Sequence, residues 1–100
     1  MNTSAQVSFE LNQKAYMVVV GNGEKAQLPI HKGHLLVFES LLHAGPVAQS
    51  LVERGIIAQV IPMDLGVLCC LAEGQHLGLW MTRYDGTLVS IGKIAWGNDV

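Results

Sequence analysis

Alternating apolar and polar positions at the start of the chain predict a β-hairpin. Residues 7–11 (VSFEL) alternate between the two kinds of side chain, residues 12–14 are polar, and residues 15–20 (AYMVVV) are almost wholly apolar. The first pattern is typical of a strand with one solvated face, and the second of a strand covered on both faces. We therefore expect an N-terminal hairpin whose second arm is central in a sheet.

The apolar spacing then changes and predicts two short helices. The first covers residues 31–44 and the second residues 46–54. Pro46 separates them, because proline suits the first position of a helix, and Gly55 supplies the C-terminal stop. At about 100° per residue, the side chains on the apolar side of the first helix are Leu35, Phe38, Leu41 and Leu42.

The last part of the chain returns to strand patterns. Asp85-Gly86 is a strong signal for a two-residue type I′ hairpin turn, and Gly74-Gln75 is a candidate for a second one. The fold class predicted for the single domain 1–100 is therefore α+β, with the N-terminal hairpin, the two helices and an antiparallel four-strand run, the sheet being packed on the helices. The strands of that run are residues 56–62, 66–73, 76–84 and 87–96.

These turns fix a register and bring together a candidate polar site. The register places Glu73 opposite His76, Lys93 diagonal to His76, and Trp80 on the same face. An acid, a base and a cation beside an aromatic ring could line a binding pocket. Charged strand ends beside turns are also ordinary solvated rims, so both interpretations stay open.

Two histidines form a second candidate binding site. His31 and His34 continue the apolar side of the predicted first helix at its start, where the helix dipole favours a neutral imidazole. They are either structural residues or, less readily, an acid–base pair. A zinc site needs three or four ligands, and His43 points elsewhere, so we expect no metal and no cofactor.

Composition favours self-association over nucleic acid or membrane. Charged residues make up 14% of the chain and hydrophobic residues 50%, so a small domain of this kind should bury surface against a partner, a dimer being favoured. The net charge of −2 argues against nucleic acid. No membrane span or signal peptide is apparent, and adjacent Cys69 and Cys70 suit a reducing compartment, so we expect a cytoplasmic protein.

Two further motifs carry little weight. Residues 21–26 spell G-x-G-x-x-A, but Leu28-Pro29 intervenes before the helical pattern begins. A dinucleotide fingerprint requires a helix that begins at the glycine turn and a parallel strand with a closing Asp or Glu after it. The two predicted helices resemble a helix-turn-helix only in layout, because the second carries too little positive charge.

The sequence thus supports one leading function and two alternatives. The leading one is a small self-associating protein that binds a protein partner as a regulator, adaptor or inhibitor, without catalysis. Its contact surface would surround Trp80, since aromatic residues anchor interfaces. The alternatives are a small-molecule-binding domain with a pocket between sheet and helices, and a small enzyme that uses a histidine base.

Overall fold

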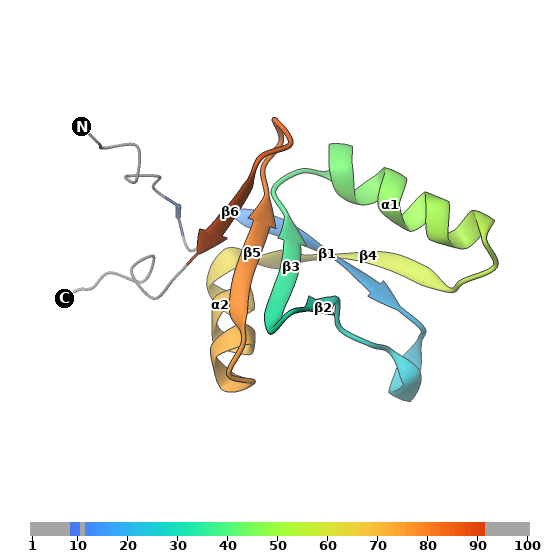
Figure 1. Cartoon of the computed structure of the whole chain (residues 1–100), viewed down its shortest axis with the longest axis horizontal. Coiled ribbons are helices and arrows are strands. Elements are labelled where there is room, and N and C mark those ends of the chain that lie inside the picture. Colours follow the sequence, from blue (N-terminus) through green and yellow to red (C-terminus); the bar gives the residue numbers. More distant parts are fainter. Residues whose placement is uncertain (1–8, 11, 92–100) are drawn as a thin grey trace.

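The computed structural model describes residues 9–10 and 12–91 and has an α+β fold, a sheet of six strands with two α-helices (Figure 1). The predicted fold class is therefore confirmed at that level. The elements in chain order are β1 (Lys14–Val20), the short 3-10 helix η2 (Gly23–Lys25), β2 (Ile30–His31), β3 (His34–Phe38), α1 (Leu41–Glu53), β4 (Ala58–Asp64), α2 (Leu65–Gly74), β5 (Gly78–Thr82) and β6 (Leu88–Ile91).

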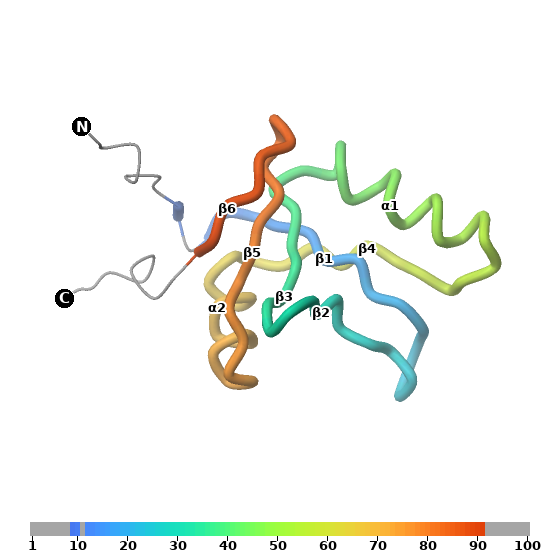
Figure 2. Tube along the Cα trace, in the orientation of Figure 1, coloured from blue at the N-terminus to red at the C-terminus, as the bar shows by residue number. Residues whose placement is uncertain are grey.

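The sheet is mixed, so the predicted antiparallel four-strand run is wrong. Its strand order is β4-β1-β3-β5-β6, with β2 paired to β3 outside this path. β1 runs antiparallel to both β3 and β4, β5 runs antiparallel to β6, and β3 and β5 are parallel. The trace in Figure 2 shows that neighbouring strands come from distant parts of the chain.

The parallel strands explain why the two helices lie on opposite faces of the sheet. Parallel strands need long crossover connections, which helices usually provide. α1 leads from β3 across β1 to the edge strand β4, and α2 leads back from β4 to β5. Connections between parallel strands are almost always right-handed. The connection through α1 moves along the sheet from β3 to β4, and the connection through α2 moves back from β4 to β5, so two right-handed connections place the helices on opposite faces.

Each helix builds its own core against alternate residues of the strands. α2 buries Leu68 and its neighbours against a cluster that includes Met17, Leu35 and Met81. α1 packs Ala44 and Ala48 on Val18, with Phe38 at the margin. The small alanine side chains allow α1 to approach the sheet closely.

The predicted N-terminal hairpin is wrong, although its second arm is a strand. β1 covers residues 14–20 and is buried on both faces, as the apolar run indicated. Its hydrogen-bonded neighbours, however, are β4 and β3. Phe9 and Glu10 are not in a strand, and the other residues of the first arm lie outside the described residues.

The predicted helix over residues 31–44 is wrong, because its first half is a tight β-hairpin. His31 pairs with His34, and the turn residues Lys32 and Gly33 have φ values of 51° and 78°. Positive φ at both turn positions is the type I′ geometry that matches the twist of a hairpin. Alternation then buries Leu35 and Val37 on one face of β3.

In place of two predicted helices there is one, α1, which begins at Leu41 and passes through Pro46. The Ser40 hydroxyl caps its start by accepting the N–H of Leu42 at 3.0 Å. Ala44 and Ala48, on either side of the proline, are both buried in the same core cluster and keep the helix continuous. The predicted stop at Gly55 is correct, since its φ of 84° accompanies a Schellman hydrogen-bond pattern.

The predicted strand over residues 66–73 is helix α2. Leu65, Leu68, Cys69 and Ala72 are buried at the i, i+3, i+4, i+7 spacing of one helical face. Residues 65–72 are apolar almost throughout, and such a run cannot be assigned to strand or helix by periodicity alone. Within the described residues, neither α-helix is long and apolar enough to cross a membrane.

The hairpin at Asp85-Gly86 is correct, but its register is shifted by one residue. The N–H of Arg83 donates to the Thr87 carbonyl at 2.7 Å, and Gly86 has a φ of 91°, which defines a three-residue loop with a bulge. Trp80 therefore pairs with Ser90 and not with Ile91, which is buried on the opposite face. A shift of one residue exchanges the two faces of a strand.

The G-x-G-x-x-A segment forms a turn, as expected. Its regular structure is the three-residue 3-10 helix η2, so no α-helix begins at this turn. Gly21 is required here for a steric reason: it has a φ of +87°, and a Cβ atom would lie 2.6 Å from the Lys25 carbonyl oxygen.

Candidate functional site

A stacked pair of aromatic rings marks the face of the sheet that α1 covers only in part. The imidazole of His34 on β3 lies against the indole of Trp80 on β5, with 3.9 Å between ring centroids and an angle of 17° between planes. The parallel register pairs His34 with Gly78, so Trp80 stands two residues along the neighbouring strand on the same face. Both side chains are half-buried.

The His34 ring is held in this position from two sides. Its Nδ1 lies 2.8 Å from the Lys32 carbonyl oxygen, which can only accept, so Nδ1 carries a proton and donates. Below the ring is Gly78, where a Cβ atom would be 2.5 Å from Cδ2 and 2.9 Å from Nε2 of His34. The missing side chain at Gly78 therefore makes room for the stack.

We expect Gly78→Ala and His34→Ala to be strongly non-additive. With His34 present, the new methyl group displaces the ring and removes a stacking interaction of about 1 kcal/mol. With His34→Ala, the same methyl group meets no ring, and alanine is favoured over glycine in a strand by about 0.5–1 kcal/mol. Urea unfolding of the four proteins should give a coupling of about 1–2 kcal/mol. Additivity to within about 0.3 kcal/mol would show that the ring does not occupy this position.

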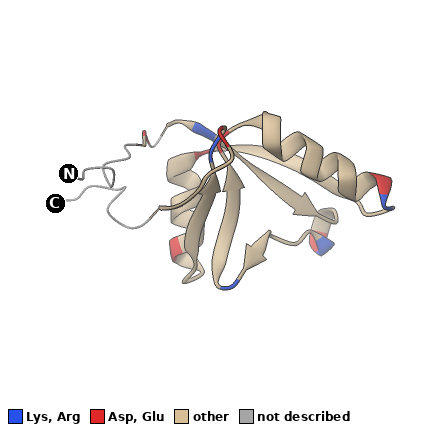
Figure 3. Ribbon diagram, turned by 45° about the horizontal axis from the view of Figure 1, so that its top comes forward, with Lys and Arg blue, Asp and Glu red and all other residues tan. Residues whose placement is uncertain are grey.

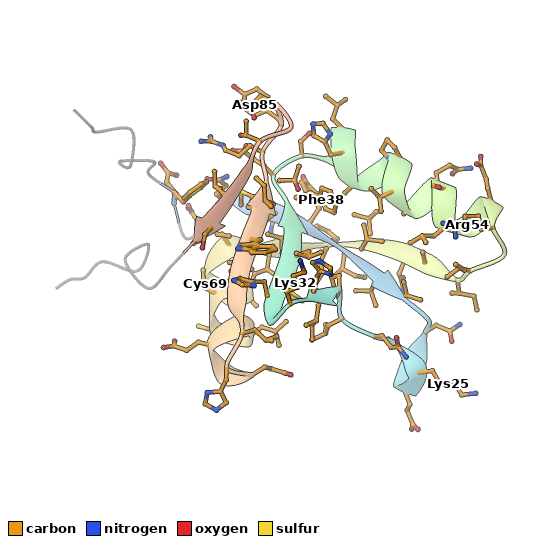
Figure 4. All side chains as sticks on the ribbon, in the orientation of Figure 1. Lys25, Lys32, Phe38, Arg54, Cys69 and Asp85 are labelled. Carbon is orange, nitrogen blue, oxygen red and sulfur yellow. The ribbon has the colours of Figure 1, made fainter. Side chains whose placement is uncertain are left out.

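We call the surface around this stack the open face; it consists of His34, Leu36, Gly78, Trp80, Leu88 and Ser90. Cross-strand pairing places Leu36 beside Trp80 and Trp80 beside Ser90 on this face. In the described part of the chain, the β3 residue that packs against the core cluster under α1 is Phe38, which Figure 4 labels. Beyond that point Leu88 is 57% exposed.

The structure brings three of the six candidate residues together. His31 is the cross-strand partner of His34 and shares its face, so His31, His34 and Trp80 lie on one side of the sheet. Their proximity comes from a hairpin and not from a helix start. Lys93 lies outside the described residues.

Glu73 and His76 are not opposite one another in a sheet, because residues 65–74 are helical. Glu73 is exposed in the last turn of α2. His76 follows the helix end with a φ of 58°, and the N–H of Leu77 donates to the Ala72 carbonyl at 2.8 Å. His76 thus occupies the left-handed position of a Schellman motif, where glycine is usual.

A cluster around Glu39 joins α1, β3 and the β5–β6 loop, and sequence reasoning missed it. The Glu39 carboxylate accepts Nε of Arg83 at 3.1 Å and the backbone N–H of Tyr84 at 3.1 Å. Nε2 of His43 donates to the Tyr84 carbonyl at 2.8 Å. Glu39 lies between β3 and α1, so it does not share a helix with His43. The partners are more than forty residues apart in the chain, which left no local signal.

The charged state of Glu39 is favoured in this cluster. Burial opposes ionisation, but the hydrogen bonds from Arg83 and from the Tyr84 N–H outweigh it and hold the pKa of Glu39 below its usual value. Arg83 also lies over the ring of Phe9, 5.3 Å from the centroid, in a cation–π contact. The cluster thus fixes the loop that connects β5 to β6.

The two cysteines differ in environment, and both are free thiols. Cys69 is buried in α2, and burial raises its pKa to about 11, so it remains a thiol at neutral pH. Cys70, the next residue, is exposed. Among the described residues, no three potential metal-ligating side chains come together.

Comparison with protein-family models, curated proteins and solved structures found no match to this chain.

Proposed function

We propose that this protein acts by binding a protein partner through the open face, as a regulator, adaptor or inhibitor in the cytoplasm. The observation that carries the proposal is the fixed stack of His34 on Trp80 in a part of the sheet that α1 does not cover. Large aromatic side chains contribute strongly to interfaces, and one that is already ordered loses little entropy on binding.

The chemistry of the open face supports binding over catalysis. Trp80, Leu36 and Leu88 offer apolar contacts, and among the described residues of strands β2, β3, β5 and β6 the acid–base groups on this face are the imidazoles of His31 and His34. The free cysteines Cys69 and Cys70 suit the reducing cytoplasm. The small-molecule pocket and the histidine-based enzyme remain predictions.

We test this proposal with a photo-crosslinking phenylalanine analogue at Leu88, and with the same analogue at Val67 as the control. Leu88 is 57% exposed on the open face, and Val67 is 51% exposed on α2. We expect protein adducts from Leu88 but not from Val67, both with the purified chain and with an extract of the source cells. Trp80→Asp should reduce the Leu88 adducts about thirtyfold, as loss of an interface anchor worth about 2 kcal/mol would.

Two results would overturn the proposal. One is equal labelling at Leu88 and Val67, and the other is labelling at Leu88 that Trp80→Asp leaves unchanged. Circular dichroism and thermal unfolding check that the variant is folded, and Leu36→Asp replaces it if it is not.

A further inference from the structure

We propose that Asn22 is a site of spontaneous deamidation, a modification that replaces its side-chain amide with a carboxylate. Asn22 precedes Gly23 in the turn after β1, away from the open face, and the chain contains no other Asn-Gly sequence. Glycine has no Cβ atom to hinder the approach of its backbone nitrogen to another group. Whether the reaction occurs in a folded chain depends on the structure around the two residues, because hydrogen bonds can hold the reacting groups apart.

The reaction needs only these two residues and water. The backbone nitrogen of Gly23 loses its proton and attacks Cγ of Asn22, so that a C–N bond forms and the side-chain nitrogen leaves as ammonia. Water then opens the resulting five-membered imide ring at one of its two carbonyl groups. One product is aspartate, and the other is isoaspartate, in which the main chain runs through Cβ and Cγ. One water is consumed for each ammonia released, and nothing is oxidised or reduced.

Both reacting groups are accessible in the structure. Asn22 and Gly23 are exposed, and the Asn22 side chain makes no capping hydrogen bond to η2. A Cβ atom on Gly23 would meet nothing within 4 Å, so the space beside its backbone is open. Figure 3 shows η2 at the margin of the molecule, with its acidic and basic residues in red and blue. The Asn22 side chain can therefore approach the Gly23 nitrogen without displacing a packed neighbour.

The main chain of the turn can open without disturbing the sheet. Ring closure requires the peptide group between Asn22 and Gly23 to rotate, which breaks the hydrogen bond from the Lys25 N–H to the Asn22 carbonyl at 3.0 Å. This bond lies among exposed residues, where water replaces a lost partner. Val20 and Gln27 close the base of the turn through two backbone hydrogen bonds, which the rotation leaves in place. Such a turn opens locally at a small cost in free energy.

The turn between β5 and β6 has the opposite arrangement and provides a matched comparison. The Asp85 carboxylate accepts the backbone N–H of Thr87 at 3.0 Å and the Thr87 hydroxyl at 2.7 Å. The N–H of Gly86 donates to the Arg83 carbonyl at 2.8 Å. The attacking nitrogen and the group that it would attack are thus each held by another partner. Asp85→Asn places an Asn-Gly pair in this turn, and its amide oxygen can accept the same two hydrogen bonds.

Isoaspartate at this position changes the turn more than aspartate does. The carbonyl that accepts the Lys25 N–H leaves the main chain, and one additional carbon atom enters the main chain before Gly23. The preceding residue, Gly21, donates its N–H to the Ile57 carbonyl at 2.8 Å, next to the start of β4. We therefore expect isoaspartate to loosen the turn where β1 ends, while the sheet stays folded.

The experiment is incubation of the purified full chain at neutral pH, either folded in buffer or unfolded in guanidinium chloride, followed by tryptic mass mapping. Trypsin releases residues 15–25 and 84–93, one peptide for each turn, and deamidation adds one mass unit. We expect the 15–25 peptide to convert in the folded chain at a rate within about fivefold of that in the unfolded chain. In Asp85→Asn, the 84–93 peptide should convert at least about tenfold more slowly when the chain is folded. Asn22→Gln should abolish the gain of mass in the 15–25 peptide.

Three results would overturn the proposal. The first is conversion of the 15–25 peptide that folding slows by more than about fivefold, because the turn would then keep Gly23 from the Asn22 side chain. The second is a gain of mass in this peptide that persists in Asn22→Gln. The third is equal conversion of the two peptides in folded Asp85→Asn, since the dipeptide alone would then set the rate. Circular dichroism shows whether Asp85→Asn is folded, and the comparison of folded with unfolded native chain does not depend on that variant.

Discussion

Replacing Glu39 with glutamine is expected to lower the free energy of unfolding at neutral pH by about 2 kcal/mol. The Glu39 side chain is only 15% exposed and the Arg83 side chain 28%, so this ion pair is poorly screened by water. The variant keeps the shape of the side chain but loses the charge that Arg83 and the Tyr84 N–H contact. Urea unfolding measures the difference.

The same variant tests the pH dependence that the cluster predicts. The pKa of Glu39 is lower in the folded chain than its usual value of 4.5. A carboxyl of this kind stabilises the fold above its unfolded pKa, and the stabilisation is lost as the pH falls through the folded pKa. The difference between the native chain and Glu39→Gln should therefore be full at neutral pH, should begin to shrink as the pH falls towards the usual value of 4.5, and should close as the pH falls through the lower pKa of the folded chain.

Glu53→Gln is the matched control for this prediction. Glu53 is exposed at the end of α1, where its carboxylate accepts a hydrogen bond from the Gln49 side chain at 3.2 Å. Its substitution should leave stability nearly unchanged over the same pH range. A Glu39→Gln deficit that stays constant down to pH values near 3 would show that the carboxyl is not what stabilises the cluster.

Leu68→Ala is expected to cost about 3 kcal/mol, the largest effect of any single truncation proposed for this chain. Leu68 is fully buried under the sheet, in contact with the cluster around Met17 and Leu35. Truncation removes apolar contacts and leaves a cavity that the rigid strands above cannot fill. Thermal or urea unfolding gives the loss directly.

The neighbouring residue supplies the control and tests the helix itself. Val67 precedes Leu68 and is 51% exposed, whereas Cys69, which follows Leu68, is buried. Two consecutive buried residues beside an exposed one fit a helix, not a strand with alternating faces. Val67→Ala should therefore change stability by less than about 0.5 kcal/mol. A cost similar to that of Leu68→Ala would mean that residues 66–73 form the strand that their apolar run suggested.

Features encoded in short segments could be predicted from the sequence. The apolar run of β1, the glycine stop at Gly55 and the turn at Asp85-Gly86 each act through residues that are adjacent in the chain. Each depends on local backbone geometry or on burial of a continuous apolar run. The α+β class follows from the same signals.

The features that were predicted wrongly depend on distant partners or on unusual turn residues. Lys32 occupies a positive-φ position where asparagine or glycine is common, which concealed the β2–β3 hairpin within an apparent helical pattern. The apolar run of α2 fits either helix or strand until β4 and β5 are known to be parallel. Only the hairpin and the parallel register together bring His31, His34 and Trp80 to one face.

The parallel pairing of β3 with β5 also constrains the order in which this chain folds. His34 pairs with Gly78, so the centre of the sheet joins residues 44 positions apart. During synthesis β3 is complete long before its parallel neighbour exists, and its Leu35 and Val37 have no β5 to pack beside. Such non-local contacts slow folding, because the chain loses conformational entropy before the contacts form and stabilise it. The hairpins β2–β3 and β5–β6 can form locally, but β3 and β5 can pair only after both connecting helices, α1 and α2, are in place.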